Sequence, residues 1–117
     1  MGMDANLLAI GRFDDDLLGY GQLDYPDDYY YDVTKAAVIL VTLFNCVTSE
    51  SSRELANCFD VDPWDFNTHY IPHQAMRWKL DDKLDSLTKM DIFEQEEIQF
   101  FKLLIDKDFY FIYQPNG

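Results

Sequence analysis

The segment AAVILVTLFNCV at residues 36–47, which contains the longest apolar run of the chain at residues 36–44, constrains the fold more than any other segment. Its β-branched residues favour a strand, and its nearly continuous apolar character is typical of a strand buried on both faces. We therefore expect Ala36–Val47 to be the central strand of a small sheet. A bilayer span needs about 20 apolar residues, so this run is too short to cross a membrane.

Two shorter segments near the ends of the chain also predict strands. Asn6–Ile10 is a short apolar run, and Phe109–Tyr113 has apolar side chains on both sides. An exposed edge strand such as Phe109–Tyr113 is one route to a homodimer, and a monomer is the alternative. Between the first two strands, Asp14 is placed to cap a short helical turn that carries Leu17 and Leu18.

The middle of the chain has two segments with helical periodicity. The first helix is Thr48–Phe59: Thr48, Ser49 or Ser51 can cap it, and Ser51 with Glu54 fits a capping box. His73–Met90 reads as a single helix, with Lys83 among the polar side chains of its outer face. Its apolar stripe consists of Met76, Leu80, Leu84 and Leu87.

A third helix is predicted after residue 90. Asp91 and Glu94 have the spacing of a capping box, and Lys102 and Lys107 lie near the other end, as the helix dipole favours. The apolar stripe of this helix consists of Ile98, Phe101, Leu104 and Ile105.

This order of elements predicts one α+β (α/β) domain spanning residues 1–117. The chain is 48% hydrophobic, which is ample for one core. We expect a central sheet of three to four strands, packed by three to four helices.

The stretch VDPWDFNTHYIPH, residues 61–73, combines both histidines with two aspartates and a tryptophan. We expect Trp64 and Phe66 to pack against the core, because both are too apolar to remain in water. Thr68–Ile71 fits a short edge strand that ends at Pro72.

A two-histidine, one-carboxylate metal site is a minor alternative for this stretch, using His69 and His73 with Asp62 or Asp65. Pro72 disfavours a helix that would bring the two histidines together on one face.

No catalytic motif is evident, so the chain is not expected to be an enzyme or to hold a cofactor. Neither cysteine is flanked by histidine, and no glycine pattern fits a phosphate loop. Cys46 and Cys58 are interpreted as small buried residues. The first residues lack the pattern of a signal peptide, so a cytoplasmic location is expected.

Charge is the strongest global signal. The net charge is −13, and residues 1–32 hold eight aspartates against one arginine. Such a field repels nucleic acid and anionic membranes, and it accelerates association with a basic protein. The predicted partner is therefore a protein with a basic surface.

The partner-binding surface is predicted in the acidic, tyrosine-rich first third and in the aspartates of the 61–73 stretch. Tyrosine offers a large contact area at low entropic cost, and aspartate pairs with lysine and arginine. Alternatively, these aspartates only solvate a loop, while the tyrosines pack against the sheet. The candidate residues are Asp14, Asp15, Asp16, Asp24, Asp27, Asp28, Tyr29, Tyr30, Tyr31, Asp62 and Asp65.

In size, acidity and its DYPDDYYYD segment, the chain resembles the immunity proteins of bacterial polymorphic and contact-dependent toxin systems. The resemblance implies an inhibitor that covers the basic active site of a cognate toxin, often a nuclease. The alternatives are a general protein-interaction or regulatory domain, a phage-type inhibitor, and a small metal-dependent enzyme using His69 and His73.

Overall fold

The computed structural model describes residues 4–13, 15–17 and 38–116 of the chain. Within them, one antiparallel sheet of four strands has the order β2-β1-β4-β3. The strands are β1 (Asp4–Arg12), β2 (Val38–Cys46), β3 (His69–Ile71) and β4 (Tyr110–Asn116).

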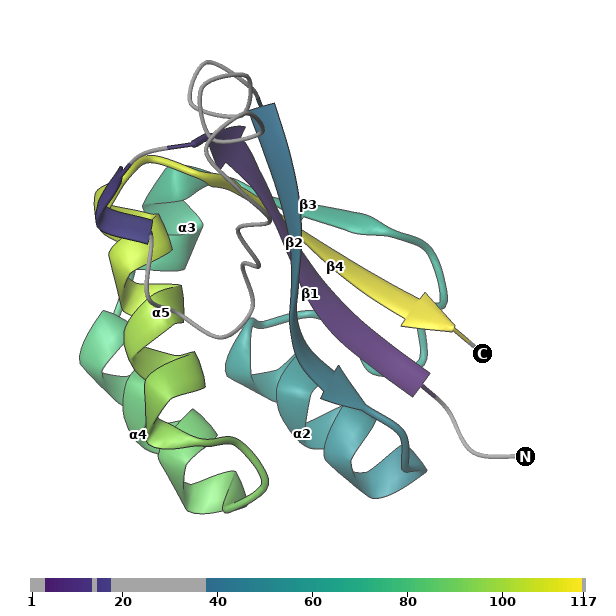
Figure 1. Cartoon of the computed structure of the whole chain (residues 1–117). Coiled ribbons are helices and arrows are strands. Elements are labelled where there is room, and N and C mark those ends of the chain that lie inside the picture. The colour runs from purple at the N-terminus through teal and green to yellow at the C-terminus, as the bar shows by residue number, and fades with distance from the viewer. Residues whose placement is uncertain (1–3, 14, 18–37, 117) are drawn as a thin grey trace.

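Four α-helices pack on one face of this sheet (Figure 1). They are α2 (Ser49–Cys58), α3 (His73–Arg77), α4 (Leu80–Met90) and α5 (Gln95–Asp106), and a short 3₁₀ turn, η1 (Asp15–Leu17), follows β1. The predicted α+β class is confirmed.

The core lies between the sheet and the helices. Alternate residues of β1 are buried toward the helices, and the apolar stripe predicted for α5 is buried against them. The ring of Phe101 lies at the centre, 5.1 Å from the ring of Phe44, 5.8 Å from that of Phe59 and 5.5 Å from that of Phe111. These are edge-to-face geometries, which aromatic pairs favour.

Strand β2 lies at an edge of the sheet, so the predicted central position of Ala36–Val47 is wrong. Val41 and Leu43 face the helices and are buried, whereas Val38 and Leu40 are 62% and 61% exposed on the opposite face. The reason is that the described helices cover one face only, so a strand of this sheet buries every second residue.

The predicted short strand before Pro72 is confirmed, since β3 forms the other edge of the sheet. Strand β4 is an inner strand. It pairs with β1 from Tyr110 to Asn116 and with β3 through Phe111–Tyr113. The suggestion of Phe109–Tyr113 as the edge strand of a dimer is therefore wrong.

Thr48, one of the three predicted caps, is the N-cap of α2, and the capping box predicted for Ser51 and Glu54 is not formed. The hydroxyl of Thr48 accepts a hydrogen bond from the backbone N–H of Ser51 (3.1 Å) and lies 2.6 Å from the Ser51 hydroxyl. Ser51 is thus the third helical residue, and this leaves Glu54 too far along the helix to close a box with the cap.

The single helix predicted for His73–Met90 is two helices. Trp78 is extended and Lys79 is left-handed (φ 48°), which separates α3 from α4. Lys83 is buried, contrary to its predicted place on the polar face, and its Nζ donates to the carbonyl of Trp78. The lysine thereby satisfies a carbonyl that the helix break leaves without a helical partner.

The capping pair predicted for α5 is also wrong. Asp91 is the left-handed C-cap of α4 (φ 57°), and its backbone N–H bonds to the carbonyl of Thr88. Helix α5 begins only after Glu94, which makes no side-chain cap hydrogen bond.

Candidate functional site

Most of the predicted acidic and tyrosine-rich surface lies outside the described residues. This applies to Asp14, Asp24, Asp27, Asp28, Tyr29, Tyr30 and Tyr31, and to the side chain of Asp15. Asp16 is described and exposed, and its Oδ2 lies 2.6 Å from Nζ of Lys107 at the end of α5. The structure therefore directs attention to the other two candidates, Asp62 and Asp65.

Asp62 and Asp65 lie in the loop that joins α2 to β3, residues 59–68, hereafter the aromatic loop. The loop leaves the helix through a left-handed Asp60 (φ 57°), and the N–H of Val61 bonds back to the carbonyl of Ala56 (2.9 Å). This is the hydrogen-bond pattern of a Schellman motif. Phe59, next to it, is buried against Phe101, so the start of the loop is fixed to the core.

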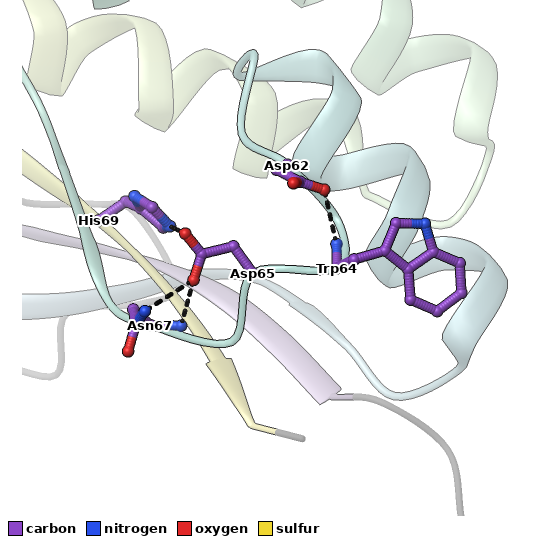
Figure 2. Close-up of polar contacts among 5 residues, drawn as sticks. All are labelled: Asp62, Trp64, Asp65, Asn67 and His69. Carbon is purple, nitrogen blue, oxygen red and sulfur yellow. Dashed lines mark hydrogen bonds and ion pairs between the residues drawn. The ribbon is translucent and has the colours of Figure 1, made fainter.

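Each aspartate holds the backbone two residues ahead of it (Figure 2). Asp62 Oδ1 accepts from the N–H of Trp64 (2.9 Å), and Asp65 Oδ1 accepts from the N–H of Asn67 (3.0 Å). These are Asx turns, which aspartate forms readily. The N–H of Asp65 also bonds to the carbonyl of Asp62 (3.1 Å), so the two turns are consecutive.

Asp65 connects the aromatic loop to β3. Its Oδ1 accepts a second hydrogen bond from Nδ2 of Asn67 (2.9 Å), and its Oδ2 lies 3.1 Å from Nε2 of His69. Nε2 has no well-directed hydrogen bond to a described residue, so the contact with Asp65 is mainly electrostatic. The backbone hydrogen bond from Asn67, helped by His69, lowers the pKa of Asp65 below the ordinary carboxyl value.

The two aromatic side chains of the loop project into solvent. Trp64 is 66% exposed and Phe66 is 52% exposed, so the prediction that they pack against the core is wrong. The consecutive Asx turns fix the backbone locally, and the core beneath is already filled by Phe59 and Phe101. Figure 2 shows the Trp64 ring directed away from Asp65 and His69. The guanidinium of Arg53 lies 5.9 Å from the centre of that ring.

A surface hollow of about 260 Å³ lies beside the aromatic loop. Buried Phe59 and Ile71 are among its lining residues, and so are His69 and the exposed carboxylates Asp60 and Asp62. A hollow with apolar lining and two acids suits a long side chain that ends in a positive charge.

The two histidines face different groups. His69 faces Asp65, whereas Nε2 of His73 lies 3.0 Å from the carbonyl of Phe109 and its ring stacks on Tyr110 at 4.9 Å. Over residues 4–13, 15–17 and 38–116, no three His, Cys, Asp or Glu side chains gather in a way that would hold a metal ion.

Both cysteines are free thiols, and burial raises their pKa values to about 11 for Cys46 and about 12 for Cys58. Cys46 is buried as predicted, and Cys58 is partly exposed, with its thiol near the carbonyl of Lys83. Because only the thiolate is a strong nucleophile, neither side chain is activated at neutral pH.

Comparison with protein-family models, curated proteins and solved structures found no match for this chain. None of the helices in the described part of the chain is long and apolar enough to cross a membrane.

The sequence reasoning missed Trp64, Phe66 and Arg53 as surface residues of the site. A signal for the first two was present: Asp62 and Asp65 stand two residues before Trp64 and Asn67. Two adjacent D-x-x units of this kind are typical of consecutive Asx turns, which hold a loop at the surface.

Proposed function

We propose that this protein is a protein-binding inhibitor that contacts a basic partner through the aromatic loop. The observation that carries the proposal is the exposure of Trp64 and Phe66 on a backbone held by Asp62 and Asp65. Exposed tryptophan is the residue type most enriched among the side chains that dominate binding energy.

The fixed backbone of the loop supports this function energetically. Ordering a flexible loop on binding costs conformational entropy, and that cost reduces affinity. Here the hydrogen bonds to Trp64 and Asn67 already hold the backbone in the free protein. Trp64 and Phe66 can therefore be buried by a partner without first ordering the segment that carries them.

Charge specifies the chemistry of the partner. Asp60 and Asp62 line the hollow beside the aromatic loop, and the whole chain carries a net charge of −13. A lysine or arginine of the partner would place its aliphatic stem against Phe59 and Ile71 and its charge near the two carboxylates. The long-range field would accelerate the encounter.

Within this class, we assign the protein to the toxin-neutralising immunity proteins. Its size, its acidity and the absence of a catalytic motif from its sequence support this assignment. The target would be a toxin of the nuclease type, whose phosphate-binding cleft accepts carboxylates in place of phosphates. The protein would act in the cytoplasm, where two free thiols remain reduced.

The test begins with capture of the partner by the tagged full chain from lysate of its native host. The captured protein is then expressed alone and together with this chain in a growth assay. The proposal expects growth arrest by the captured protein alone and recovery when the two are expressed together.

The test variant combines Trp64→Ala with Phe66→Ala. The control is the single variant Trp78→Ala, which removes a tryptophan of similar exposure outside the loop. The loop double variant should fail to restore growth, whereas the control should restore it fully. A captured protein that does not arrest growth would refute the immunity assignment, and equal rescue by the loop variant would refute the proposed surface.

A further inference from the structure

The face of the sheet opposite the helices forms a second apolar surface, hereafter the open face. It contains side chains from all four strands: Leu8, Ile10, Val38, Leu40, Tyr70, Tyr110 and Ile112. Four of them, Val38, Leu40, Tyr70 and Tyr110, are more than half exposed. No described helix covers this side of the sheet (Figure 1).

The strand register makes these side chains contiguous. Ile10 is paired with Leu40 of β2 on one side and with Tyr110 of β4 on the other. Leu8 is likewise paired with Ile112 of β4 and with Thr42 of β2, and the uncharged polar pair of Asn6 and Gln114 follows it along the strands. Residues paired in this way have Cβ atoms about 5 Å apart, so they form continuous rows across the sheet. A largely apolar, uncharged surface of this kind is typical of a protein interface.

Among the described strand residues, charges on this face are confined to the two ends of β1. Because side chains alternate along a strand, Asp4 and Arg12 project on the same side as Leu8. Both are exposed, and they lie roughly 27 Å apart at about 3.4 Å per residue. Among the described residues, none forms an ion pair with Arg12.

We infer that the open face binds a second copy of this chain, face to face, around a two-fold axis. The axis lies in the interface, perpendicular to β1 near Leu8. Asp4 of each chain then meets Arg12 of its partner, while the apolar rows pack between the two ion pairs. Two sheets packed in this way lie about 10 Å apart with their strands within about 30° of each other.

The same charges argue against other occupants of the open face. A basic protein would find one carboxylate and one guanidinium here, with an uncharged surface between them. A second copy neutralises both charges, because each end of β1 meets the opposite end of the other β1. Edge-to-edge pairing of β2 would extend the sheet and leave the open face, with Tyr70 and Tyr110 on it, uncovered.

Net charge gives the dimer a distinctive response to salt. Two chains of −13 repel each other at long range, and added salt screens that repulsion. Screening does not weaken the contacts between the apolar rows, and the two ion pairs at the ends contribute little to the free energy of dimerisation. Dimerisation should therefore strengthen as salt rises, whereas binding of a basic partner should weaken.

Sedimentation equilibrium of the full chain at about 0.05 M and 0.5 M NaCl measures this directly. We expect a monomer–dimer equilibrium that is tighter at high salt. Leu40→Lys places a charge in the interface and should weaken dimerisation by at least about tenfold. Ile92→Lys changes a similarly exposed residue outside the open face and should leave dimerisation unchanged.

A charge exchange tests the two-fold arrangement itself. Asp4→Arg alone and Arg12→Asp alone should each weaken dimerisation, and the double variant should restore it. Circular dichroism confirms that each variant is folded. A chain that remains monomeric at high salt, a dimer insensitive to Leu40→Lys, or a double variant that is not restored would each overturn the inference.

Discussion

The aromatic loop and the open face both expose apolar side chains, but the two surfaces are built differently. The loop presents Trp64 and Phe66 from a short segment, which is held by side-chain hydrogen bonds and accompanied by aspartates. The open face presents aliphatic and tyrosine side chains from four strands, with charges only at the ends of β1.

The difference in the placement of charge predicts a different kind of partner for each surface. A surface with excess negative charge favours a partner of opposite charge, and salt weakens the complex. A surface with an uncharged centre and opposite charges at its ends is complementary to itself. Exposed hydrophobic area alone does not distinguish the two surfaces, so the placement of charge is the basis for proposing a different partner for each.

The largest expected effect is the loss of partner binding in Trp64→Ala. Removal of a central tryptophan should weaken binding of the captured partner by at least about 30-fold, equivalent to about 2 kcal/mol. Because the side chain is mostly exposed in the free protein, the melting temperature should hardly change. Isothermal titration calorimetry and thermal denaturation together give both values.

The control for that experiment is Trp78→Ala, which removes an exposed tryptophan from the break between α3 and α4. It should bind the partner as the wild type does. Equal losses in the two variants would mean that the aromatic loop has no special role.

The second prediction tests whether the two surfaces are independent. Leu40→Lys should weaken dimerisation by at least about tenfold and leave partner affinity unchanged, whereas Trp64→Ala should weaken partner binding and leave dimerisation unchanged. Both properties are measured on each variant and on the double variant. Loss of both properties in either single variant would show that the surfaces are coupled.

A smaller effect is expected from Asp65→Ala, which removes the acceptor for two hydrogen bonds from Asn67. The loop backbone should open more often, so the Asn67 amide should exchange with solvent about tenfold faster. Partner binding should weaken by a smaller factor than in Trp64→Ala, because the aromatic contacts are retained. Hydrogen exchange by NMR is the measurement, with open-face amides such as that of Ile112 as the internal control.

The smallest expected effect is the pH dependence of the stabilisation that Asp65 gives the aromatic loop. The pKa of Asp65 is lowered, so the ionised form is the one that the folded loop stabilises. Its contribution is fully present above the ordinary value of 3.8 and is lost as the pH falls through the lowered pKa. The contribution of Asp65 to the protection of the loop amides against exchange should therefore be unchanged from pH 7 down to about pH 5. An Asp65 carboxyl that titrates at or above 3.8 by NMR would contradict this.

Local patterns in the sequence predicted much of the fold. Apolar segments located β1, β2 and β4, Pro72 marked the end of β3, and helical periodicity located the buried stripe of α5. These features depend on neighbouring residues alone, so periodicity is sufficient to find them. The α+β class followed from the order of the elements.

Features that depend on distant residues were not predictable in this way. The edge position of β2 depends on how β1 and β4 pair, and its sequence resembles that of a strand covered on both faces. The break after α3 depends on a left-handed Lys79, and on Lys83, which reaches the Trp78 carbonyl. Neither residue type signals a helix break by itself.

The site was predicted in part. Asp62 and Asp65 were named as partner-binding residues, but Trp64 and Phe66 were assigned to the core because of their hydrophobicity. Hydrophobicity gives the free-energy cost of exposing Trp64 and Phe66, whereas the Asx turns hold the backbone in the conformation that exposes them. Turn chemistry was therefore the more informative signal in this stretch.

The central claim is that the aromatic loop binds a basic protein through both its aromatic side chains and its charge. The most direct test is the affinity of the captured partner for wild type and Trp64→Ala at about 0.05 M and 0.5 M NaCl. We predict that salt weakens both complexes by about the same factor, about tenfold, and that Trp64→Ala weakens binding at both concentrations. Affinity that is independent of salt, or equal for the two proteins, would contradict the account.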